Sequence, residues 1–162
     1  MTPIMPDRLC WASTIGLFII NFGTLDLHVQ DYLENNLSPE EFAKLKERPF
    51  YERVERIKAH VSQAEHEPDK RRAREEFFIR LEPIRELRNH IAHGLLRMAL
   101  AEDKKTWTIT LSLPRDMDGT NSPKVRHLTF EELLKASTAL TNLCEDFMRL
   151  FGNWVVDADM RF

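Results

Sequence analysis

Residues that could carry out acid–base chemistry on a phosphate occur together in the stretch RELRNHIAHG, residues 85–94. A histidine can take or give a proton near neutral pH, and an arginine supplies a permanent cation whose planar fork matches phosphate oxygens. An asparagine can orient a bound group through its amide. Arg88, Asn89 and His93 together could therefore support phosphodiester cleavage, with His93 transferring a proton and Arg88 stabilising charge on the phosphate. RNA would supply its own nucleophile, the 2′-hydroxyl, so no metal would be required.

The helix expected around this stretch places Arg88 among apolar residues. Its apolar lane is formed by Phe77, Leu81, Ile84, Ile91 and Leu95. At about 100° per residue, Arg88 falls near the middle of that lane. Asn89 and His93 flank Arg88, whereas His90 turns away. A cation in an apolar lane is costly unless an anion or a partner meets it, so this placement indicates a functional site.

Each residue of this set also has a structural interpretation. Arg88 could form an ion pair with a core acid such as Asp26, or with Glu82 or Glu86 on its own helix. His93 could offset the dipole at the end of its helix. Asn89 could be an ordinary polar surface residue.

A metal site is a further alternative, because His90 and His93 lie three residues apart on one helix. No third ligand stands at a useful spacing, so we expect neither a metal nor another cofactor. Cys10 and Cys144 are far apart in the sequence, and we predict that they are reduced residues of the core.

Two further residues are possible helpers of the site, and a basic run is a possible RNA contact. Asp26 and Arg85 are the helpers, although a structural role for Asp26 is the simpler interpretation. The candidates for phosphate contacts are Lys70, Arg71, Arg72, Arg74 and Arg97. Most basic runs are merely solvated, and Glu75 and Glu76 follow this one. Trp107 and Trp154 could stack on a base, but packing in a core or interface is their more common role.

Composition limits the class of protein. The chain has 162 residues and a net charge of −3, so we expect one domain spanning residues 1–162. The acidic balance argues against coating of nucleic acid by the whole surface. The apolar stretch after Arg8 is shorter than the roughly 20 apolar residues that are needed to span a membrane, and it has no clear signal-peptide cleavage site. We therefore expect a cytoplasmic protein with no membrane partner.

Periodicity predicts a mainly all-α fold with a small β-hairpin. Helices are expected at 7–36, 39–47, 51–64 and 68–93, the last ending before Gly94. Ser38 with Glu41, and Thr129 with Glu132, have the spacing of capping boxes, and a final helix follows Thr129. The β-hairpin is expected at about 95–113, followed by a loop at 114–124.

The motif in this setting resembles the HEPN superfamily of small antiparallel helical bundles. Their shared motif is an arginine, a polar residue and, four to six residues after the arginine, a histidine near a helix end; here it is RNHIAH, residues 88–93. The resemblance implies that Arg88 and His93 are catalytic and that Asn89 supports them. It also implies a homodimer in which the motifs of two subunits line one cleft.

The resemblance sets the expected function. Many members are metal-independent endoribonucleases of toxin, phage-defence or RNA-processing type, and an antitoxin or another regulatory protein is therefore a possible partner. We therefore expect RNA as the substrate. Two alternatives remain: a non-catalytic HEPN-like module that binds a nucleotide, RNA or protein, and a purely structural helical interaction protein.

Overall fold

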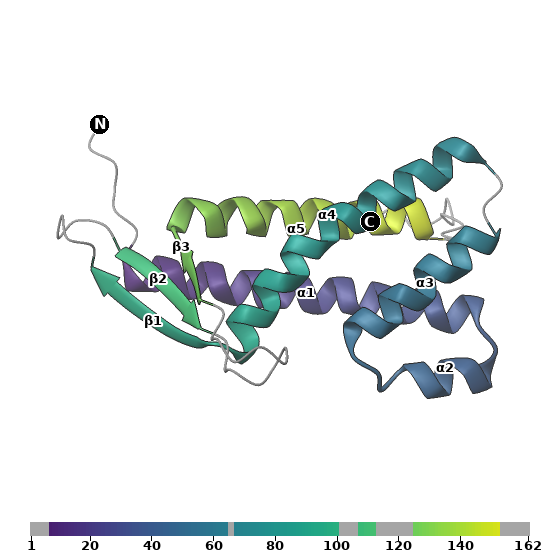
Figure 1. Cartoon of the computed structure of the whole chain (residues 1–162), viewed down its shortest axis with the longest axis horizontal. Helices are drawn as coiled ribbons and strands as arrows, with labels where there is room; N and C mark the ends of the chain where they lie inside the picture. Colours follow the sequence, from purple (N-terminus) through teal and green to yellow (C-terminus); the bar gives the residue numbers. More distant parts are fainter. Residues whose placement is uncertain (1–6, 65–66, 101–106, 113–124, 153–162) are drawn as a thin grey trace, which may run out of the picture. The chain divides into compact units, whose positions relative to one another are not determined.

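The computed structural model describes residues 7–64, 67–100, 107–112 and 125–152. These residues form five α-helices and one antiparallel three-stranded sheet (Figure 1). In chain order the elements are α1 (Arg8–Asn36), α2 (Pro39–Leu45), α3 (Phe50–Ala64), α4 (Pro68–His93), β1 (Leu95–Leu100), β2 (Trp107–Ser112), β3 (Val125–Leu128) and α5 (Phe130–Phe151). The prediction of a mainly helical protein is therefore confirmed.

Both predicted capping boxes are present. The Ser38 hydroxyl accepts a hydrogen bond from the backbone N–H of Glu41 and so caps α2. At the start of α5, the Glu132 carboxylate accepts from the backbone N–H of Thr129, and the Thr129 hydroxyl accepts from the N–H of Glu132. The bond from the Thr129 N–H holds the pKa of Glu132 below its ordinary value. Local polar spacing therefore sets where these helices begin.

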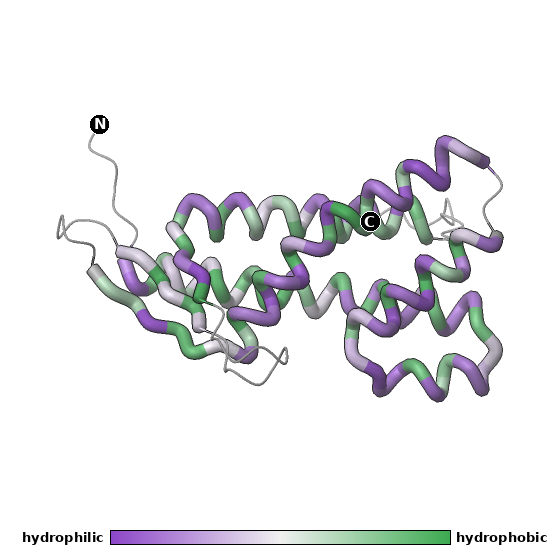
Figure 2. Tube along the Cα trace, viewed as in Figure 1, coloured by the Kyte–Doolittle hydropathy of each residue, from purple (hydrophilic) through white to green (hydrophobic). Residues whose placement is uncertain are grey.

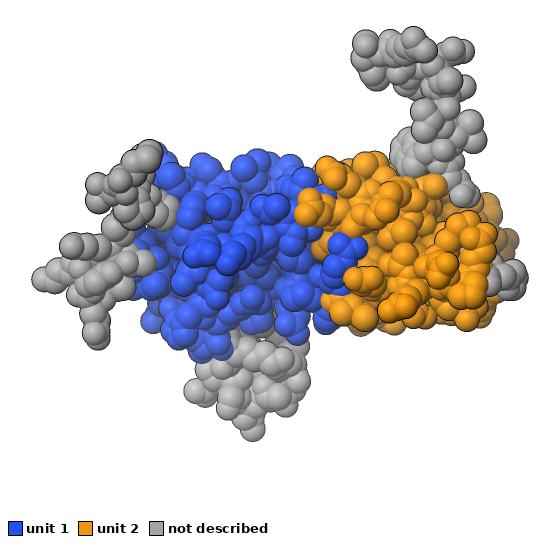
Figure 3. Space-filling model, turned by 90° about the horizontal axis from the view of Figure 1, so that it is seen from above, with its two compact units in different colours: residues 1–22, 80–141 blue, residues 23–79, 142–162 orange. Residues whose placement is uncertain are grey.

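The chain divides into two compact units, each of which takes part of α1, α4 and α5 (Figure 3). The first, here called the sheet unit, comprises residues 1–22 and 80–141 and contains the strands. Its core side chains are fully or almost fully buried: Trp11, Phe18, Phe22, Leu81, Ile84, Leu87, Ile109, Leu111, Leu128, Leu133 and Leu140. Trp11 meets Phe130 edge to face, with ring centroids 5.2 Å apart.

The sheet has the order β1-β2-β3. β1 pairs with β2 so that Leu96 lies opposite Leu111, and Ile109 on β2 lies opposite Leu128 on β3. Ile109, Leu111 and Leu128 are buried, as the two-residue period of a strand requires when one face is covered. The predicted hairpin strands are confirmed, but β3 was not foreseen. The predicted turn and the loop at 114–124 lie outside the described residues.

The second unit, here called the aromatic unit, comprises residues 23–79 and 142–162 and contains α2 and α3. Its core includes a cluster of rings in which Phe77, Phe147 and Phe151 contact one another at centroid distances of 4.7 to 5.7 Å. Tyr32 adds an edge-to-face contact with Phe151. The first turns of α4 are mostly hydrophilic (Figure 2), consistent with the exposure of the basic run that they carry.

Two expectations from the sequence need correction: one concerns the apolar stretch near the N-terminus, and the other concerns the cysteines. Among the described helices, α1 is long and apolar enough to cross a membrane, so the expectation that this stretch is too short was wrong. Core helices of soluble proteins and signal sequences share those properties. The prediction that both cysteines lie in the core was wrong for Cys10, which is exposed. Cys144 is half-buried, and burial raises the pKa of its thiol.

Candidate functional site

Arg88 lies on the last turns of α4 with its guanidinium against an aromatic ring. Its central carbon is 5.3 Å from the centroid of the Phe22 ring on α1, within the range of a cation–π contact. Phe22 is 4% exposed, whereas Arg88 is half-buried. Nothing in the spacing of the sequence indicates this contact between Phe22 and Arg88.

The guanidinium of Arg88 reaches both other motif residues. Its Nη1 lies 3.3 Å from His93 Nε2 and 3.4 Å from Asn89 Oδ1. Because an arginine nitrogen can only donate, both partner atoms act as acceptors. For Nε2 to accept from the guanidinium, the ring N–H of His93 must be the one on Nδ1. The structure therefore brings the three predicted motif residues together.

No carboxylate neutralises Arg88 within the described part of the chain. The proposed partner Glu82 instead pairs through both carboxylate oxygens with Arg85. Asp26 pairs with Arg53 of α3. The contacts that hold the Arg88 guanidinium in place are therefore the ring of Phe22 and two acceptor atoms, Asn89 Oδ1 and His93 Nε2.

His90 differs from His93 in what it contacts. Its Nδ1 donates to the backbone carbonyl of Glu86 at 2.8 Å, a bond within its own helix. His93 is exposed, and its ring nitrogen faces the Arg88 guanidinium. Two histidines of the same helix end therefore have separate surroundings, and only His93 is placed beside the cation.

Gly94 forms the junction between α4 and β1. Its N–H donates to the carbonyl of His90 at 2.9 Å, which closes the last turn of the helix. A Cβ at this position would lie 2.3 Å from that carbonyl oxygen and 3.3 Å from the carbonyl oxygen of Ser112 on β2. Real Cβ atoms do not approach backbone oxygen that closely, so the junction requires a residue without a side chain.

No family model, curated protein or solved structure matches the chain. The chemistry of the site must therefore be inferred from its own residues.

The two predicted helper residues are both engaged elsewhere. Asp26 Oδ2 accepts a hydrogen bond from Arg53 Nη2 at 2.9 Å, and Asp26 Oδ1 lies 2.7 Å from the same nitrogen in an ion pair. Asp26 and Arg53 belong to the aromatic unit, whereas the motif belongs to the sheet unit. Arg85 is tied to Glu82, one turn earlier on α4. These contacts give Asp26 and Arg85 structural partners of their own.

The predicted RNA-contact residues fall in both units. Lys70, Arg71, Arg72 and Arg74 belong to the aromatic unit, and exposed Arg97 on β1 belongs to the sheet unit. Arg74 is half-buried and donates from Nε to the carbonyl of Leu150. Lys70 pairs with Glu67.

The structure does not show a free stacking surface on either of the two tryptophans that were considered for base stacking. Trp107 is half-buried, with the Arg8 guanidinium 5.0 Å from its ring centroid. Trp154 lies outside the described residues. Within the described ranges, no three residues among His, Cys, Asp and Glu are grouped closely enough to hold a metal ion.

Replacing Gly94 by alanine is expected to destabilise the fold by about 1–3 kcal/mol, because the new methyl group would meet two backbone carbonyls. Urea denaturation measures the change. Gly16→Ala is the matched control: a Cβ there meets nothing within 4 Å, and alanine is favoured over glycine inside a helix by about 0.5–1 kcal/mol. Equal effects at the two glycines would contradict the steric explanation.

Proposed function

We propose that this chain is a HEPN-like helical domain that cleaves RNA without a metal ion. The proposal depends chiefly on one observation: the Arg88 guanidinium, which has no carboxylate partner in the described part of the chain, lies 3.3 Å from His93 Nε2. A cation without a partner acid attracts a phosphate, and the lone pair beside it can accept a proton. Support also comes from the helical setting and from the position of His93 at the end of α4.

The reaction would proceed by transfer within the RNA. The 2′-oxygen attacks the adjacent phosphorus and passes its proton to Nε2 of His93, while the bond from phosphorus to the 5′-oxygen breaks. The products are a 2′,3′-cyclic phosphate and a 5′-hydroxyl, whose proton comes from a general acid or water. Arg88 would move from His93 toward the phosphorane and stabilise its charge. Asn89, which accepts from Arg88, would position that guanidinium.

The resemblance to HEPN proteins extends the proposal to assembly. Two copies would join so that both motifs face one cleft, and His93 of the second copy could then protonate the leaving 5′-oxygen. A cytoplasmic toxin, phage-defence or RNA-processing enzyme is the corresponding cellular role, and an antitoxin or regulatory protein is a fitting partner.

The proposal is tested by incubating the purified protein with total RNA in the presence of EDTA. We expect cleavage to persist and the products to carry a 2′,3′-cyclic phosphate and a 5′-hydroxyl. An oligonucleotide with a single 2′-deoxy substitution at the cut site should resist cleavage, since its nucleophile is missing. Products with a 5′-phosphate, or full cleavage of the deoxy substrate, would contradict this mechanism.

A non-catalytic HEPN-like module is the second candidate, because Phe22, Asn89 and His93 already hold Arg88 in a stable position that also suits binding. It predicts that RNA is bound but not cleaved. Replacing Arg88 by alanine would then weaken RNA binding in a filter or fluorescence assay. Cleavage that requires His93 would exclude this candidate.

A further inference from the structure

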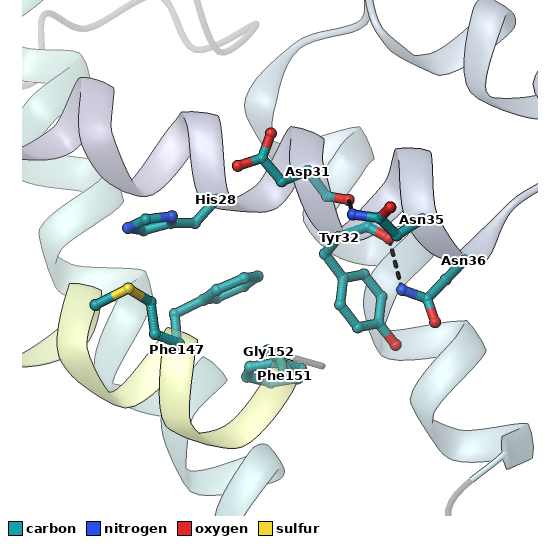
Figure 4. A pocket seen from close by; sticks show the side chains of 9 residues that line it. His28, Asp31, Tyr32, Asn35, Asn36, Phe147, Phe151 and Gly152 are labelled. Carbon is teal, nitrogen blue, oxygen red and sulfur yellow. Dashed lines mark hydrogen bonds between the residues drawn. The ribbon is translucent and has the colours of Figure 1, made fainter. Parts of the chain in front are cut away.

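A cavity of about 530 Å³ lies within the aromatic unit, between side chains of α1 and α5 (Figure 4). Its volume is within the usual range for small-molecule sites. The α1 residues that line it belong to the last turns of that helix, and the α5 residues likewise belong to the last turns of theirs. None of the predicted motif residues lines this cavity.

Helix polarity makes this cavity favourable for positive charge. α1 ends at Asn36 and α5 ends at Phe151, so the cavity lies at two helix C-termini. The last carbonyls of a helix carry a partial negative charge and attract cations. Among the residues that the structure describes, no lysine or arginine lines the cavity. An anion such as phosphate would therefore find little to bind there.

The polar lining is rich in acceptors. Asn35 and Asn36 use their amide N–H groups on the carbonyls of Asp31 and Tyr32, each at 2.8 Å. The Oδ1 atoms of both asparagines accept no hydrogen bond within the described part of the chain. The carboxylate of Asp31 is exposed and forms no ion pair with the described residues. A ligand with several N–H donors matches this set.

Aromatic faces supply the rest of the lining. Phe147 stacks on Phe151 with centroids 4.7 Å apart, and the His28 ring lies nearly parallel to Phe147 at 6.3 Å (Figure 4). Rings attract cations through their faces and also cover an apolar stem. The thioether of Met148 adds an apolar contact surface.

One arginine of the chain, Arg74, already makes this kind of contact with the end of α5. The Arg74 guanidinium lies 5.3 Å from the centroid of Phe151 and donates from Nε to the carbonyl of Leu150 at 2.9 Å. The last turn of α5 thus already binds one guanidinium through a ring face and a terminal carbonyl. Arg74 does not line the cavity.

From these features we infer that the cavity binds a small organic cation, namely a primary ammonium or guanidinium group on an apolar stem. The cation would lie near the Asp31 carboxylate and the helix-end acceptors, and its stem would lie against Phe147 and Met148. This inference does not depend on RNA cleavage, because none of its residues belongs to the motif.

Calorimetric titration of the full chain with spermidine and with agmatine tests the inference. Asp31→Asn should weaken binding roughly tenfold, the scale of one charge-assisted hydrogen bond. Glu34→Gln is the matched control, since Glu34 is an exposed acid of the same helix that does not line the cavity. The Glu34→Gln variant should bind the cation with an affinity within about twofold of that of the unchanged chain.

A second measurement locates the bound cation. With methyl-labelled methionine, the NMR signal of Met148 should shift on addition of spermidine, and that of Met98 on β1 should not. Equal weakening by Asp31→Asn and Glu34→Gln would overturn the inference, because it would show unspecific attraction to an acidic surface. Absence of binding, or a Met148 signal that does not move, would also overturn it.

Discussion

Replacing His93 by alanine is expected to slow RNA cleavage by about 10²- to 10⁴-fold, the usual contribution of a general acid or base. The reason lies in the position of Nε2, 3.3 Å from Arg88 and available as an acceptor. Rates of cleavage of a labelled oligonucleotide in EDTA measure the effect. The fold should be unaffected, because His93 is exposed and its removal leaves no buried group unpaired.

The same helix offers a matched control in His90→Ala. His90 bonds to the carbonyl of Glu86 and does not face Arg88. Its loss should change cleavage less than about threefold, since the substitution removes a histidine from the same helix end without touching the site. If the two alanine variants cleaved RNA equally well, His93 would not be the proton acceptor. Arg88→Lys would then test the cation, because lysine keeps the charge but lacks the planar fork.

Replacing Asp26 by alanine is expected to lower the free energy of unfolding by about 3 kcal/mol. Its partner Arg53 has a side chain only 7% exposed, and Nε and Nη1 of that guanidinium have no hydrogen-bond partner among the described residues. Removing Asp26 would leave a buried cation without compensation. The Asp26 side chain is 29% exposed, so the value should fall at the lower end of the range for buried pairs.

Urea denaturation with circular dichroism measures this loss, and Asp31→Asn on the same helix is the control. Asp31 is exposed without an ion pair among the described residues, so its replacement should change stability by less than about 0.5 kcal/mol. The double variant with Asp26→Leu and Arg53→Met should recover most of the lost stability, because no buried charge remains. A loss below about 1 kcal/mol in Asp26→Ala would show that Arg53 is solvated after all.

Much of the fold could be predicted because its signals are local. The capping boxes at Ser38 and Thr129 depend on residues three positions apart, and Gly94 marks the end of α4 as expected. The β1 and β2 strands were indicated by their residue types. In contrast, β3 has four residues and one buried side chain, Leu128, which is too short a pattern to recognise.

The site could be predicted in part for the same reason. Arg88, Asn89 and His93 share one helix end, so the helical period alone brings them together. The contact with Phe22 joins distant parts of the chain, and no periodic pattern encodes it. The predicted apolar lane does not include Leu87, which lies next to Arg88 and is only 1% exposed. The burial of Arg53 against Asp26 likewise could not be predicted, since ion pairs between two helices have no characteristic spacing in the sequence.

The connection between α4 and β1 cannot take an additional residue without a change in the structure on one side of it. One residue, Gly94, separates the last helical residue from the first strand residue, and a Cβ on it would meet the backbone oxygens of His90 and Ser112. An inserted residue here would turn His93 about its helix axis or shift β1 by one position against β2, which reverses the faces of the strand. Among related sequences, length variation should therefore fall elsewhere, and the interval from Arg88 to Leu95 should be inherited as a unit of constant size.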